Sequence, residues 1–104
     1  IVMVDDMIST AGTITGAAKM VKERGAKKIV VGATHGVFAG PAIERLSDAP
    51  IDEVFVTDTI PLKESVKSLK NLKVLSVAAL IGEAMRRIHS NESISTMFQK
   101  FGQL

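Results

Sequence analysis

One pattern repeats along the chain and constrains its fold more than any other feature. A short run of apolar, largely β-branched residues is followed by a loop with glycine or proline and then by residues at helical spacing. The apolar runs lie at 1–4, 28–33, 53–57 and 73–77. Strands that alternate with helices form parallel sheets through right-handed crossovers. Because these runs are apolar at successive positions, they are typical of strands buried on both faces. We therefore predict an α/β fold, a mostly parallel sheet with flanking helices on both faces.

Helices are predicted after three of these runs. The third has apolar residues at i, i+3 and i+4 spacing, and Pro41 is expected at the first position of the second. The predicted helices cover residues 14–24, 41–49 and 78–89. Residues 90–104 form a polar C-terminal tail with a few spaced apolar residues, which we expect to dock on another surface.

Composition excludes several classes of function. The 104 residues carry a net charge of only +2, four Phe and no Trp or Tyr, so a nucleic-acid partner is not expected. The lack of cysteine rules out disulfides and thiol catalysis. No stretch approaches the roughly 18 apolar residues of a membrane span, and we expect a cytoplasmic protein without a membrane partner. The chain starts at Ile1, inside a predicted strand and without an initiator Met, which we interpret as the cut end of a longer protein.

The opening stretch, VDDMISTAGT, is the strongest candidate for a binding site. Two acids end the first predicted strand, and ligands of open α/β sheets bind beyond the carboxyl ends of strands. Small residues and hydroxyls follow, in a loop that leads into a helix and suits an anion. The acids could accept hydrogen bonds from sugar hydroxyls or hold a hydrated Mg²⁺. The pattern predicts a sugar-phosphate site made by Asp5, Asp6, Ser9, Thr10, Ala11, Gly12 and Thr13.

A simpler interpretation of the same residues is helix capping. Ser9 or Thr10 could cap the following helix, and acids are favourable near a helix start. Gly12 is expected to allow unusual backbone angles. No Gly-Lys-Ser/Thr follows, so the loop is not a Walker loop.

Further polar residues have weaker claims to function. His35 and Asp58 follow the second and third predicted strands, at the same edge of the sheet. His35 could instead be a loop histidine that makes structural hydrogen bonds. Asp58 could instead be a turn residue before Pro61. Glu44 and Arg45 are expected to form a solvated helix face. His89 is expected to complement the end of its helix.

Several motifs together resemble a known family. VDDMISTAGT resembles the phosphoribosyl-pyrophosphate (PRPP) loop of the type I phosphoribosyltransferase fold. THGVFAGPAIERL, IDEVFVTDTIPL and LIGEAMRRIHSNESISTMF are similar to the C-terminal domain of class I ribose-phosphate diphosphokinases, the PRPP synthetases. The similarity runs from residue 1 to about residue 98. It implies that residues 1–104 are a C-terminal, phosphoribosyltransferase-like domain, one half of a two-domain parent.

The resemblance implies a specific activity for the parent protein. Such enzymes transfer the diphosphoryl group of ATP to ribose 5-phosphate with Mg²⁺ and assemble as hexamers. Asp5 and Asp6 would hold the ribose hydroxyls and, through water, the metal, while residues 9–13 would cradle the 5-phosphate. The family's catalytic residues lie outside this chain, so the chain alone should be inactive. Ser93, Ser95 and Phe98 would bind an allosteric phosphate or ADP at a subunit interface.

One residue departs from the family pattern. Ser9 stands where many members have Asp, which removes a carboxylate beside the sugar. Two other interpretations therefore remain open, a phosphoribosyltransferase and a non-catalytic regulatory protein of the same fold. The first would need a base-binding hood and a pyrophosphate loop, and neither is found in the sequence.

Overall fold

The structure, a computed structural model, describes the backbone of residues 1–102 and the side chains of residues 1–99. The last two residues of the predicted tail thus lie outside the described part. In chain order the elements are β1 (Val2–Ile8), α1 (Gly12–Glu23), β2 (Val30–Gly36), α2 (Ala42–Asp48), β3 (Glu53–Thr57), the short 3₁₀ helix η1 (Glu64–Ser68), β4 (Leu72–Leu75), α3 (Ala78–His89) and α4 (Ile94–Gly102).

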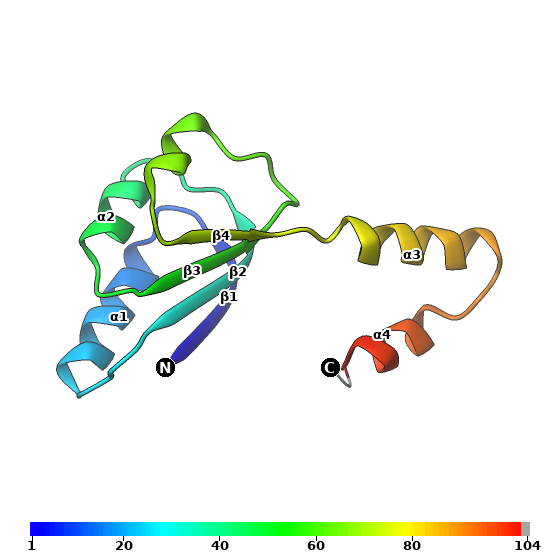
Figure 1. The fold of residues 1–104 in the computed structure, drawn as a ribbon, viewed down its shortest axis with the longest axis horizontal. Coiled ribbons are helices and arrows are strands. Elements are labelled where there is room, and N and C mark those ends of the chain that lie inside the picture. Colours follow the sequence, from blue (N-terminus) through cyan, green and yellow to red (C-terminus); the bar gives the residue numbers. More distant parts are fainter. Residues whose placement is uncertain (103–104) are drawn as a thin grey trace.

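The strands form one parallel sheet, which confirms the predicted α/β class. Their order in the sheet, β1-β2-β3-β4, is their order in the chain, and Val4, Gly32 and Phe55 form one row across the first three strands. Because the order never reverses, right-handed crossovers place every connecting helix on the same side. Figure 1 shows α1 and α2 together on one side of the sheet.

The core lies between this side of the sheet and its helices. The inward residues of the two central strands are fully buried, and helical side chains cover them. The core includes Val31, Ala33, Val54 and Val56 from the sheet and Ala18, Leu46 and Val66 from the helical layer. Alternate residues of each strand thus build a single apolar layer.

The opposite side of the sheet is uncovered within residues 1–102. Val2 is 71% exposed and Val4 79% exposed, and Phe55 and Leu75 lie in the neighbouring strands of the same face. The prediction of helices on both faces is therefore wrong for the described part of the chain. The unreversed strand order is the reason, since only a reversal would send a crossover to the second face.

The helices α3 and α4 extend beyond the sheet (Figure 1). No residue of α3 is buried, and α4 contacts α3, where Met97 is buried outside the main core. The radius of gyration is 16.1 Å, whereas a compact domain of this size has about 13 Å. The two helices form a projecting hairpin, which we call the α3–α4 hairpin.

Several predicted boundaries need correction. The first strand continues through both acids to Ile8, because it pairs with β2 as far as Gly36. Pro41 precedes α2 as its N-cap and is not its first residue. The tail beyond residue 90 is largely helical, since Ile94, Met97 and Phe98 follow helical spacing.

Candidate functional site

The loop between β1 and α1 has an unusual backbone. Ala11 is the N-cap of α1, with φ 65° and ψ 13°, and no side chain caps this helix. Capping by Ser9 or Thr10 is therefore excluded as their role. The left-handed residue is Ala11, and Gly12 has no positive φ, so the prediction for Gly12 was wrong. At Gly12 the space is narrow instead, because a Cβ there would lie 3.0 Å from Nη1 of Arg45, which would have to shift.

Three successive carbonyl groups of this loop accept hydrogen bonds from three different parts of the structure. The carbonyl oxygen of Ser9 accepts from the backbone N–H of Ala39 at 2.8 Å, and that of Thr10 accepts from Arg45 Nη1 at 3.2 Å. The carbonyl oxygen of Ala11 accepts from Thr15, from Oγ1 at 2.6 Å and from the backbone N–H at 3.1 Å. The loop is thus braced at every peptide from Ser9 to Ala11.

The backbone N–H groups on the other side of these peptides remain available. Nothing within residues 1–102 accepts a hydrogen bond from the N–H groups of Thr10, Ala11, Gly12 or Thr13. Successive unpaired N–H groups at a helix start form a concavity that suits an anion. The local backbone therefore has the donor arrangement that a phosphate group needs.

A cavity of about 170 Å³ opens at this loop. Its lining includes most of the residues predicted for the sugar-phosphate site: Asp5, Ser9, Thr10, Ala11, Gly12 and Thr13. Asp6 is not among its lining residues. The Asp6 N–H donates to Oδ1 of Asp5 at 2.8 Å. The structure thus brings Asp5 to the cavity, and Asp6 lies next to it in β1 outside the cavity lining.

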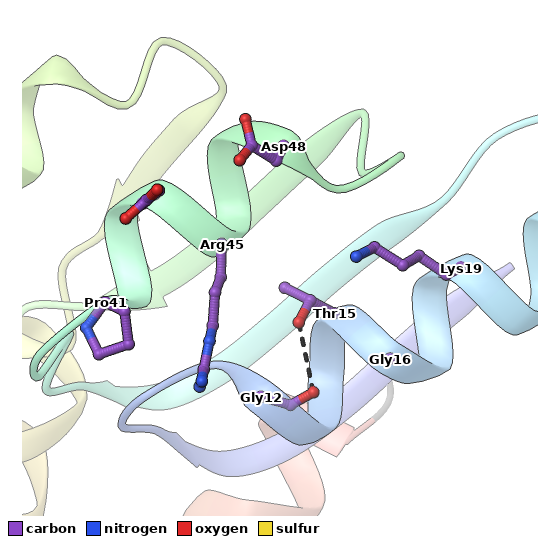
Figure 2. A pocket seen from close by; sticks show the side chains of 8 residues that line it. Gly12, Thr15, Gly16, Lys19, Pro41, Arg45 and Asp48 are labelled. Atoms are coloured by element: carbon purple, nitrogen blue, oxygen red, sulfur yellow. Dashed lines mark hydrogen bonds between the residues drawn. The ribbon is translucent and has the colours of Figure 1, made fainter.

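A second cavity, of about 450 Å³, lies between α1 and α2 behind the loop. Figure 2 shows Arg45 extending from α2 towards Gly12, with Thr15 and Lys19 on the facing helix. Arg45 is exposed, as predicted for a solvated helix face, but its guanidinium also contacts the loop. The sequence carried no signal for this contact between residues 35 positions apart. The hydrogen bond from Thr15 to the loop was also not predicted. The only sequence signal for it was the position of Thr15 one turn into the helix.

The other two candidates at the sheet edge have structural partners. Nδ1 of His35 lies 2.7 Å from Oγ1 of Thr59, and β2 places His35 beside Met7. The Asp58 carboxylate accepts a hydrogen bond from the backbone N–H of Val77 at 2.9 Å. That bond, and a second from the Ser76 side chain, hold the pKa of Asp58 below its ordinary value. Asp58 therefore anchors the start of α3.

Ser93, Ser95 and Phe98 lie on the α3–α4 hairpin, apart from the loop. The Ser93 carbonyl oxygen accepts from Nη1 of Arg87 at 2.9 Å and from Oγ1 of Thr96 at 3.0 Å. Arg87 also pairs with Glu83 at 2.9 Å. These bonds fix the turn between the two helices, and Phe98 remains exposed.

The carboxylates of β1 fit a magnesium ion only in part. The described residues contain no group of three or more acidic or histidine side chains that could enclose a metal. Asp5 supplies the hard oxygen donor that Mg²⁺ prefers, and Mg²⁺ commonly takes its remaining ligands from water and substrate phosphates. Asp5 is thus the residue at the loop that could hold Mg²⁺, which would neutralise phosphate charge there. No helix in residues 1–102 has the length and apolar character needed to span a bilayer.

A parallel sheet with a loop of unpaired N–H groups at the start of α1 defines an α/β domain whose loop has donors suited to an anion. Residues 1–99 match the model of the phosphoribosyl synthetase-associated domain. The chain belongs to this family.

Individual relatives agree with the family match. The chain is 59% identical over 98 residues to the ribose-phosphate pyrophosphokinase of Rhodopirellula baltica, covering 94% of this chain and 31% of that protein. It is 52% identical over 97 residues to the enzyme of the same name from Haemophilus influenzae, covering 93% of this chain and 31% of that protein. The crystal structure of phosphoribosylpyrophosphate synthetase from Mycobacterium smegmatis superposes with a TM-score of 0.83 at 42% identity, over 86% of this chain and 30% of that one. The chain therefore spans about a third of the length of these relatives.

Proposed function

We propose that this chain is the ribose 5-phosphate-binding, C-terminal domain of a ribose-phosphate pyrophosphokinase, working with Mg²⁺ in a homo-oligomeric parent. The observation that carries the proposal is the braced loop of residues 9–13, which has free N–H groups and lines a cavity together with Asp5. An anion cradle beside a carboxylate fits a ligand with a phosphate at one end and hydroxyls at the other. The relatives' names supply the substrate class.

In this proposal, each part of the loop has one task. The N–H groups of residues 10–13 and the hydroxyls of Ser9, Thr10 and Thr13 bind the 5-phosphate, while Asp5 accepts hydrogen bonds from ribose hydroxyls. Asp6 reaches the same ligand only if the sugar extends beyond the cavity along the edge strand β1, because Asp6 does not line the cavity. Phosphoryl transfer needs mainly positioning and charge neutralisation. The parent would take the diphosphoryl group from ATP bound elsewhere.

A regulatory protein of the same fold is the second candidate. Ser9, which replaces a carboxylate common in the enzymes the chain resembles, favours binding without turnover. A phosphoribosyltransferase is the third. Ser93, Ser95 and Phe98, as an allosteric phosphate or ADP site, belong to the first proposal alone, because they would act across a subunit interface.

Calorimetric titration with ribose 5-phosphate and Mg²⁺ tests the proposed site. We expect saturable binding that Asp5→Asn weakens by roughly 10-fold, because hydrogen bonds to a charged group contribute about 1.5–3 kcal/mol. Asp6→Asn is the matched control, because Asp6 lies next to Asp5 but outside the cavity lining. Equal loss in both variants would mean that the sugar lies along the strand edge. Binding that neither variant changes would mean that the acids serve only the fold, and no binding at all would contradict the proposed site in this chain.

A further inference from the structure

The side chain of Arg45 reaches the loop from a different element. It projects from α2 across the space in front of α1, and its Nη1 donates to the carbonyl oxygen of Thr10 at 3.2 Å (Figure 2). The absence of a Cβ at Gly12 permits this approach, since that atom would lie 3.0 Å from Nη1. Arg45 is thus part of the loop's framework, although it lies in another crossover.

The hydrogen bond from Arg45 fixes the orientation of one peptide unit. In a trans peptide, the carbonyl and the following N–H point in opposite directions, and the structure contains no cis peptide within its described residues. With the Thr10 carbonyl turned towards Arg45, the N–H of Ala11 points to the opposite side of the loop. That N–H is one of the free donors around the cavity that Asp5 lines.

The conformation at Ala11 needs such support. A positive φ of 65° is uncommon for a residue with a side chain and persists only where the surroundings hold it. Rotation of the Thr10–Ala11 peptide would relieve it, and the carbonyl oxygen would then replace the N–H at the cavity. The peptides on either side are braced by the main chain of Ala39 and by the nearby Thr15, whereas this middle peptide has Arg45 as its partner.

We propose that Arg45 is a positioning residue that locks the Thr10–Ala11 peptide with its N–H towards the bound phosphate. This proposal rests on the proposed function, since it assumes that the phosphate of ribose 5-phosphate occupies the loop. Arg45 acts through the peptide and does not touch the ligand. Its contact lies where Gly12 leaves room for the guanidinium and next to the left-handed Ala11.

Substitution of Arg45 gives a direct test. Arg45→Met keeps the aliphatic stem and removes the donor, and we expect the dissociation constant for ribose 5-phosphate to rise roughly 10-fold, as for the loss of one charge-assisted hydrogen bond. Arg45→Lys, which retains a donor and a charge, should restore affinity to within about 3-fold. Melting temperatures of all variants should stay close to that of the unmodified chain, because the contact is exposed.

Lys19 supplies the matched control. It lines the same cavity between α1 and α2, so Lys19→Met removes an equal charge without touching the loop. We expect its affinity to stay within about 2-fold of the unmodified chain. Equal weakening by Lys19→Met and Arg45→Met would overturn the peptide lock in favour of a general charge effect.

The amide signal of Ala11 provides a readout that a purely structural role would not move. In ¹H–¹⁵N spectra of the unmodified chain, ribose 5-phosphate should shift this signal, and Arg45→Met should abolish the shift while signals of the core remain unchanged. If the unmodified chain binds and Arg45→Met binds equally, the role of Arg45 fails and the proposed function stands. If the unmodified chain shows no saturable shift, the proposed function fails, and the role of Arg45 fails with it.

Discussion

The two faces of the sheet have similar residues but different surroundings. On the covered face, Val31 and Val54 are fully buried under α1 and α2, whereas on the other face Val2 and Val4 are largely exposed. The buried pair belongs to the central strands β2 and β3 and the exposed pair to the edge strand β1, and along each strand successive side chains alternate between the two faces. The strands carry apolar residues on both faces, which is typical of a sheet that is covered on both sides. In the described part of the chain, helices cover one face only.

The uncovered face has a defined shape. A shallow depression of about 230 Å³ lies over Gly32, between Val4 and Phe55 of the neighbouring strands and close to Leu75. Lys73 lies over the Phe55 ring at 5.7 Å and pairs with Glu53 at 3.2 Å, so charged side chains border the apolar surface. Exposed apolar surface of this kind carries little of the folding free energy of the described chain.

The largest expected effect comes from truncating one leucine on each side of the sheet. Leu46 is 1% exposed under the covered face, so Leu46→Ala should lower the free energy of unfolding by about 2–5 kcal/mol. Leu75 is 56% exposed on the other face, and Leu75→Ala should change it by about 0.5 kcal/mol or less. Urea denaturation measures both. A similar cost for the two variants would show that something covers the second face in solution.

Two glycines of β2 allow a second comparison, in which the expected changes in unfolding free energy are smaller. A Cβ at Gly36 would lie 2.5 Å from the ring of Phe38 and 3.1 Å from Val56, so Gly36→Ala should cost about 1–3 kcal/mol through overpacking. At Gly32, on the uncovered face, no atom lies within 4 Å of the added Cβ, and the variant should be nearly neutral. Thermal unfolding of the two variants gives the comparison. A costly Gly32→Ala would contradict an open face.

The sequence predicted local features well and distant contacts poorly. The strand 53–57 and the helix 78–89 are confirmed at both ends, because propensity and apolar spacing agree there. A loop was predicted at residues 9–13 because small residues and hydroxyls follow a strand, and the role of these residues in binding stays a prediction. The contact of Arg45 with Thr10 was missed, since it depends on how two crossovers pack. The prediction of helices on both faces was wrong, because the side that a crossover takes depends on the order of the strands in the whole sheet.

The smallest expected effect concerns the α3–α4 hairpin, which has few buried apolar contacts and depends on charged pairs. Hydrogen bonds from Arg86 and Arg87 lower the pKa of Glu83 to about 2 from its ordinary 4.5. Glu83 therefore stabilises the hairpin above about pH 4.5, and this contribution is lost as the pH falls towards 2. In the unmodified chain, NMR signals of Arg87 and Thr96 should shift over this range.

The variant Glu83→Gln isolates this carboxylate, because Asp58, whose pKa is also lowered, remains in both proteins. We expect the variant to lose the shift of the Arg87 signal between pH 4.5 and 2, while signals of Val31 and Val54 in the core stay the same in both. The exposed positions of Glu83 and Arg86 keep the effect on overall unfolding small. Identical acid titrations of the hairpin in the two proteins would show that packing at Met97, and not the charged pairs, holds α4 against α3.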